Sequence, residues 1–165
     1  MSAAQTSIET EVSTQFLTFK LGEEIFALDV AEVREILDFT SITKVPMTPP
    51  FMRGVINLRG RVVPVMDLRL MFDMSETEKT VNSCIIVIEM TMDSDNVVIG
   101  VLADAVQEVI DLEPAQIEPA PRIGTRMNTE FIEGMGKHNG GFLMILNIDR
   151  IFSSSDLDSV LAAAA

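Results

Sequence analysis

Short runs of apolar residues, most alternating with polar ones and ended by glycine or polar turns, dominate the chain. The segments TQFLTFKL (14–21) and EEIFALDV (23–30) meet at Gly22 and predict a β-hairpin. Other runs of this kind are RGVINLRGRVVPVMDL (53–68), SCIIVIEM (83–90), NVVIGVLADAV (96–106) and FLMILNIDRIF (142–152). Many short strands separated by turns are typical of small β-barrels.

Helical patterns are few and short. Val30, Val33 and Leu37 fall at positions i, i+3 and i+7, which predicts a short amphipathic helix over 30–37 with Asp29 as its cap. A second short helix is expected at DLRLMF (67–72), and a third in the last residues, 153–165. No strand alternates with a helix of 10–15 residues, so a nucleotide-binding α/β sheet is not expected.

The pattern repeats within the chain. Residues 51–72 align without a gap with residues 131–152 at an offset of 80, so that Gly60 matches Gly140. Upstream, residues 24–37 resemble residues 97–110 at an offset of 73. Two matches in the same order indicate a duplicated unit. The shared glycine predicts a turn with a positive φ angle, whereas the residues before it differ between the copies: NLR in the first and KHN in the second.

Charge is distributed unevenly along this acidic chain. The formal net charge is −13, with −3 in residues 1–74 and −10 in residues 75–165. Residues 53–69 nevertheless hold four arginines and one aspartate. The overall charge argues against nucleic-acid binding, and the basic segment favours an acidic partner surface. No run of about 18 apolar residues predicts a membrane span, and a single cysteine fits a reducing cytoplasm.

Catalytic chemistry finds little support in the residues. His138 is the only histidine and is expected in a solvated turn, while Cys84 lies in an apolar run and is expected to be buried. Asp29 and Asp67 both end strands, so that a small aspartate-dependent hydrolase is an alternative, although helix capping is the commoner role. No phosphate-binding loop or metal-ligand pattern is present. The residues favour a binding module without a cofactor or metal.

The segment RGVINLRGRVVPVMDLR resembles the CheW family of chemotaxis coupling proteins. Further support comes from FLTFKLGEEIFALDVAEVREIL, ITKVPMTPPF, IGVLADAVQEVIDL, IEPAPRIG, FIEGMG and LMILNIDRIF, in the family's order. The resemblance implies a mostly β fold, with two five-stranded SH3-like barrel subdomains intertwined over residues 15–152 and a few short helices. A flexible N-terminus, 1–14, and a C-terminal helix or tail, 153–165, would flank it.

Family members are non-catalytic adaptors in the cytoplasm. They couple the cytoplasmic tips of membrane chemoreceptors to the histidine kinase CheA by binding its regulatory domain, and they are recruited to receptor clusters without entering the membrane. An alternative within the family is a regulatory domain excised from a larger kinase.

The resemblance also suggests binding residues. Docking of the kinase or receptor is expected at Val33, Glu35, Asn57, Leu58 and Arg59. A receptor groove between the halves is expected at Ile36, Leu37, Val98 and Val101, and an array-contact loop at Arg122 and Ile123. We further expect Arg59 to pair with Glu35 and to be held by it at the docking surface. Because the second copy keeps Glu108 but has Asn139 in place of the arginine, this pair is expected only in the first half.

Overall fold

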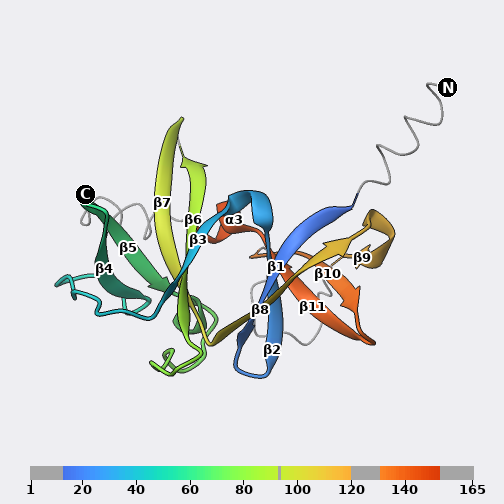
Figure 1. Cartoon of the computed structure of the whole chain (residues 1–165), viewed down its shortest axis with the longest axis horizontal. Helices are drawn as coiled ribbons and strands as arrows, with labels where there is room; N and C mark the ends of the chain where they lie inside the picture. Colours follow the sequence, from blue (N-terminus) through green and yellow to red (C-terminus); the bar gives the residue numbers. More distant parts are fainter. Residues whose placement is uncertain (1–12, 93, 120–130, 153–165) are drawn as a thin grey trace.

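Two sheets form the body of the protein in a computed structural model (Figure 1). The structure describes residues 13–92, 94–119 and 131–152. One sheet has five strands in the order β3-β6-β7-β5-β4, and the other has six in the order β8-β1-β2-β11-β10-β9. This confirms a mostly β fold of the SH3-like type, with a short extra strand in the second half.

The elements follow the predicted hairpins closely. In the first half of the chain they are β1 (Thr14–Leu21), β2 (Glu24–Asp29), η1 (Val30–Glu32), β3 (Val33–Asp38), β4 (Met52–Leu58), β5 (Arg61–Asp67) and α2 (Leu68–Met71). In the second they are β6 (Cys84–Met92), β7 (Asp95–Ala103), β8 (Ala105–Leu112), η2 (Pro114–Gln116), β9 (Ile117–Glu118), β10 (Ile132–His138), β11 (Gly141–Leu146) and α3 (Ile148–Ile151).

The predicted helix over 30–37 is wrong. A single 3-10 turn at Val30–Glu32 gives way to strand β3, which pairs antiparallel with β6. Side chains along β3 alternate between partly buried and exposed, which is the period of a strand. Three apolar residues at helical spacing fit a short strand equally well, and the β-branched Val33 and Ile36 favour it.

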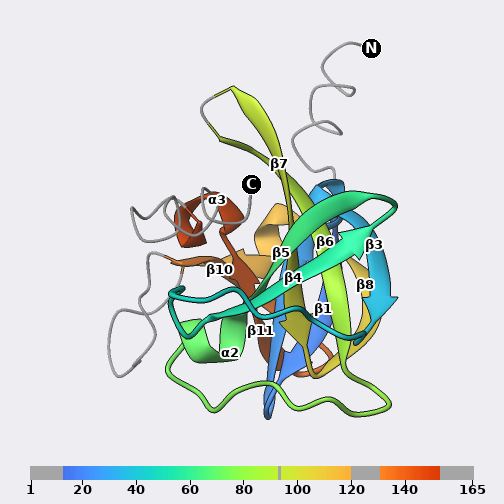
Figure 2. The ribbon, with the colours of Figure 1, turned by 90° about the vertical axis from the view of Figure 1, so that its left-hand side faces the viewer.

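Each sheet combines a hairpin from one half of the chain with the remaining strands of the other half. The β1–β2 hairpin lies in the six-stranded sheet, but the chain then crosses over and β3 joins the five-stranded sheet. The β6–β7 hairpin lies in the five-stranded sheet, and β8 crosses back to pair with β1. In Figure 1, β3 and β8 run through the middle of the molecule, and Figure 2 shows β3 next to β6.

The duplicated unit predicted from the sequence is present. The series β4-β5-α2 has the same order as β10-β11-α3, and the two hairpins turn through Arg59-Gly60 and Asn139-Gly140. All four residues have φ between 51 and 83°, as two-residue hairpin turns of type I′ require. The shared glycine is therefore set by backbone geometry.

A core lies between the two sheets and joins the halves. Phe19, Phe26, Phe72 and Phe131 form a chain of ring contacts with centroids 5.7–6.2 Å apart. Each sheet also has its own apolar cluster, which includes Val63 and Val87 in the five-stranded sheet and Phe16 and Ile110 in the six-stranded sheet. Cys84 is buried as expected.

Candidate partner-docking surface

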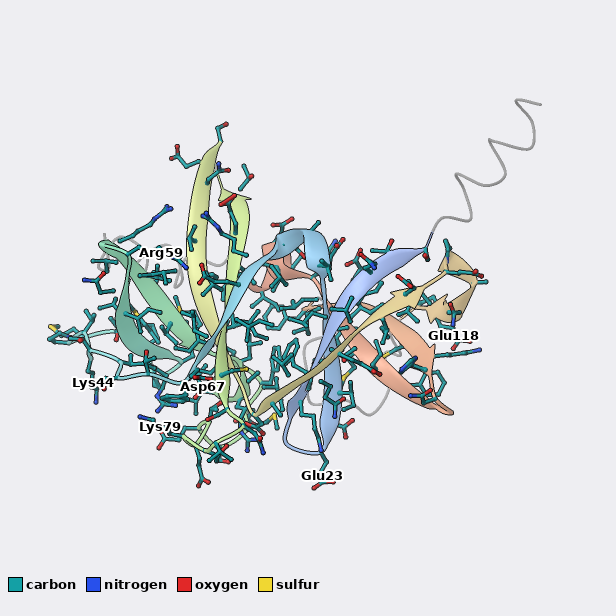
Figure 3. All side chains as sticks on the ribbon, in the orientation of Figure 1. Glu23, Lys44, Arg59, Asp67, Lys79 and Glu118 are labelled. Atoms are coloured by element: carbon teal, nitrogen blue, oxygen red, sulfur yellow. The ribbon has the colours of Figure 1, made fainter. Side chains whose placement is uncertain are left out.

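The tip of the β4–β5 hairpin is built by residues 57–60. The side-chain oxygen of Asn57 accepts a hydrogen bond of 2.8 Å from the backbone N–H of Gly60, which closes the turn on itself. Leu58 packs against the apolar cluster of the first sheet. Arg59 is left as the projecting residue, and its side chain is 73% exposed (Figure 3).

Arg59 pairs with Glu35 as predicted. The Nη1 and Nη2 groups of Arg59 donate to Oε2 and Oε1 of Glu35 at 2.8 and 2.9 Å. These hydrogen bonds hold the pKa of Glu35 below its ordinary value and raise the pKa of Arg59. Both oxygens of the carboxylate are used, so the planar guanidinium has one orientation.

The backbone at Arg59 is one that arginine rarely adopts. Its φ is 52°, in the left-handed region, where residues other than glycine, asparagine and aspartate are disfavoured. Asn139 occupies the equivalent turn position at 51° and suits it better. An arginine held there against its preference points to a role for its side chain.

Strand β3 also carries apolar residues before and after Glu35 in the sequence. Val33 is half-buried against the core between the sheets, and Ile36 is 45% exposed. Arg34 on the same strand donates to Glu89 of β6 at 2.9 Å. Strand β3 therefore presents charged groups together with an exposed apolar residue, Ile36, as the contact surfaces of transient complexes do.

The predicted receptor groove is wrong in its composition. Val98 and Val101 are buried, and they belong to different clusters because they point to opposite faces of β7. Leu37 packs into the cluster of the first sheet, and only Ile36 of the four is well exposed. Alternating strand geometry prevents these four side chains from lining one trough.

A concavity that the sequence did not predict lies beside the first sheet. Its volume is about 1170 Å³, and residues 39–50 form much of its wall. Its lining includes Phe39, Ile42, Lys44, Met47, Arg53 and Lys79. Lys44 and Lys79 project at the outer end of the half that holds β4 and β5 (Figure 3). The prolines of KVPMTPP were the available signal for an irregular wall here.

Comparison with known proteins identifies the family. A profile described as "CheW-like domain" matches residues 15–156. The chain is 34% identical over 146 residues to the chemotaxis protein CheW of Klebsiella aerogenes, covering 88% of this chain and 86% of that protein. It is 31% identical to the CheW of Thermotoga maritima, with coverage of 83 and 86%. The crystal structure of scaffolding protein TtCheW from Thermoanaerobacter tengcongensis has a TM-score of 0.76 at 35% identity, covering 87 and 90% of the two chains.

The chain belongs to the CheW family.

Two other arginines of this CheW-family chain, Arg53 and Arg69, have structural roles. Arg53 donates to Oδ2 of Asp67 at 2.9 Å and to the carbonyl of Thr77 at 3.0 Å. The backbone and hydroxyl of Thr77 both donate to the same buried aspartate. Arg69 pairs with Asp104 at 2.6 Å and reaches the carbonyl of Ser75. The segment after α2 is thus fixed to the sheet by charged groups.

The two aspartates of the hydrolase alternative are helix caps. Asp29 accepts from the N–H of Ala31, and Asp67 accepts from the N–H of Arg69 while it is fully buried against Arg53. The findings on relatives support neither a hydrolase nor an excised kinase domain. Across the described ranges, no three His, Cys, Asp or Glu side chains cluster as metal ligands, and no helix is long and apolar enough to cross a membrane.

Glu108 occupies the position in this CheW-like fold that Glu35 occupies in the first copy. Among the described residues no arginine pairs with it, as expected, but its Oε1 lies 3.2 Å from Nε2 of His138. That partner lies one residue before the position equivalent to Arg59. Arg122, Ile123, the predicted tail 153–165 and residues 1–12 of the predicted N-terminal segment 1–14 lie outside the described residues, whereas Thr14 already belongs to β1.

Proposed function

We propose that this chain is a non-catalytic chemotaxis adaptor that couples chemoreceptors to the histidine kinase CheA. It binds the kinase's regulatory domain and the cytoplasmic tips of the receptors, and it works in the cytoplasm at receptor clusters without a cofactor. Membership of the CheW family supports this proposal, as do relatives named chemotaxis proteins and a scaffolding protein.

The ion pair of Arg59 and Glu35 is the observation that carries the proposal. An exposed ion pair stabilises a folded chain very little. The left-handed backbone at Arg59 offsets part of that stabilisation. The pair does fix a guanidinium at the tip of the β4–β5 hairpin, next to strand β3. We propose that Val33, Glu35, Asn57, Leu58 and Arg59 form this docking surface, with Ile36 at its edge.

A double-mutant cycle on binding tests the surface. Glu35→Ala, Arg59→Ala and the double variant are titrated with the purified regulatory domain of the kinase and with a receptor cytoplasmic fragment. We expect Arg59→Ala to weaken binding of one partner at least about tenfold, with clear coupling to Glu35→Ala, because Glu35 orients the guanidinium. Arg61→Ala is the matched control, since Arg61 is an exposed arginine on the same hairpin.

Normal binding of both partners by Arg59→Ala contradicts the docking surface. Equal losses of affinity for Arg59→Ala and Arg61→Ala would mean that binding depends on the overall positive charge of the hairpin and not on the position of Arg59. If neither partner binds the wild-type chain, the adaptor function itself is contradicted.

The array-contact loop stays part of the proposal. Replacing Ile123 with glutamate is expected to weaken assembly of receptor, kinase and adaptor into larger complexes, measured by sedimentation, while the thermal midpoint stays the same. A large fall in the midpoint would instead assign Ile123 to the core.

A further inference from the structure

A small pocket with both polar and apolar lining opens at the six-stranded sheet, next to the β10–β11 turn. Its volume is about 150 Å³. It is lined by Thr18, Ile25, Glu108, His138, Phe142 and Leu143, together with Gln107 and Asn139. The ring of Phe142 is 58% exposed. None of these residues belongs to the docking surface described above.

The equivalent place in the five-stranded sheet is filled by apolar side chains. Thr18 corresponds to Val87, because their cross-strand partners, Ala27 and Gly100, are 73 residues apart. The same offset relates Ile25 to Val98. Val87 and Val98 are both buried in the cluster of the first sheet. The two halves therefore share a backbone here but differ in polarity.

The turn residues show the same difference. At the offset of 80, His138 corresponds to Leu58, which packs on the first cluster, and Asn139 corresponds to Arg59. In the first turn, the guanidinium of Arg59 thus pairs with Glu35 next to Leu58, which packs on buried apolar side chains. The second half has an imidazole and an amide, and a pocket remains beneath them.

Glu108 holds the place of Glu35 but lacks its partner. Its backbone is fixed by Thr18, whose hydroxyl donates to the Glu108 carbonyl at 2.7 Å and accepts from the Glu108 N–H at 3.1 Å. Among the described side chains, only the imidazole of His138 contacts its carboxylate, at Oε1. The Glu108 side chain is 59% exposed, and Asn139 is bonded to His138 instead.

We propose that this pocket binds the guanidinium of an arginine side chain presented by a partner protein. The guanidinium of the partner's arginine donates to Glu108, as the guanidinium of Arg59 donates to Glu35 within this chain. The pocket holds the equivalent of about five water molecules, which is room for a planar guanidinium and part of its stem. Phe142 offers an exposed aromatic face against which a guanidinium stacks. This site does not depend on the function proposed above.

Binding of a blocked amino acid tests the chemistry. The probe is N-acetyl-arginine amide, titrated into the isotope-labelled full chain and followed by backbone amide chemical shifts. We expect saturable shifts at Glu108, His138 and Phe142, with a Kd on the order of 1 mM for so small a ligand. N-acetyl-lysine amide is expected to bind more weakly, because a point charge cannot use both carboxylate oxygens.

Three variants make the test specific. Glu108→Gln is expected to weaken the probe at least about tenfold, because the charge-assisted fork is lost. Glu35→Gln, the same change in the first half, is the matched control and leaves the titration unchanged. Asn139→Arg places an arginine where the first half has one, at nearly the same φ, and is expected to block the pocket from within.

Several outcomes overturn the proposal. These are the absence of saturable shifts at the pocket, equal binding of the lysine compound, and unchanged binding by Glu108→Gln. Binding of free arginine without binding of the blocked probe assigns the pocket to an amino acid ligand and not to a protein side chain.

Discussion

The two halves of the molecule share one backbone and differ in where they place charge. Arg53 and Asp67 in the first half correspond to Glu133 and Asn147 in the second, and Arg59 corresponds to Asn139. In the first half these residues join loops and strands through ion pairs. In the second half a neutral Asn147 caps α3 without such a network. The comparison teaches that the strand pattern specifies the fold, while the charged positions are free to acquire separate roles.

The largest expected difference between the halves concerns the caps Asp67 and Asn147. Asp67→Ala removes a buried carboxylate and leaves Arg53 and the N–H of Thr77 without their partner, which destabilises the fold by about 3 kcal/mol. Asn147→Ala removes only a helix cap, worth about 1 kcal/mol. Urea denaturation of both variants at neutral pH measures the two losses.

Equal losses at the two positions would show that the ionic network adds nothing to a simple cap. Arg53→Met serves as the control, because it keeps the length of the side chain and removes the charge. We expect its loss to fall close to that of Asp67→Ala.

The second difference is Glu32, which corresponds to Ala105 at the offset of 73. Partial burial, with Asp149, Asp29 and Glu133 nearby, raises the pKa of Glu32 to about 7. The folded chain therefore holds a proton that the unfolded chain releases near pH 4.5. Stability from this group is fully present below pH 4.5 and is lost as the pH rises through about 7.

Glu32→Gln tests this directly. The variant is expected to be more stable than the wild type by about 1 kcal/mol at pH 8, a figure reduced for the half-exposed position, and equally stable at pH 4. Thermal or urea unfolding across this range measures the difference. A constant difference at every pH would mean that the carboxyl does not titrate between the folded and unfolded states as described.

The smallest expected effect on stability comes from making the two turns alike. Arg59→Asn replaces a strained arginine by the residue that the second half uses, and it loses an exposed ion pair. Because these effects oppose each other, the thermal midpoint is expected to change by less than about 2 °C. A fall well beyond this in a calorimetric scan would give the pair a structural role in place of a docking one.

Much of the fold was predictable because its signals are local. Alternating apolar residues and turn glycines mark the hairpins, and the repeat at offsets of 80 and 73 places Gly60 and Gly140 in equivalent turns. The helix expected at 30–37 failed because the pairing of β3 with β6 is a contact between residues about 50 apart. Period-based reasoning on one segment does not include that contact.

The candidate site was predictable in part for the same reason. The pair of Arg59 and Glu35 was predicted because the family resemblance brings their two segments together, and the repeat showed that only the first copy has the arginine. The contact of His138 with Glu108 was missed because a shift of one residue in the turn changes which side chain reaches the carboxylate. Val98 and Val101 were misplaced because a strand buried on both faces has no polar alternation to show where each side chain points.

The crossing of β3 and β8 between the sheets has a consequence for how such a molecule diverges. Two separate copies of one half, exchanging the hairpin that precedes the crossing, would form a symmetric homodimer, in which any substitution appears at both equivalent surfaces. When both copies belong to one polypeptide, the two copies need not have the same sequence, and each surface can change independently. An arginine at one hairpin tip and an asparagine at the other are the visible result of that independence.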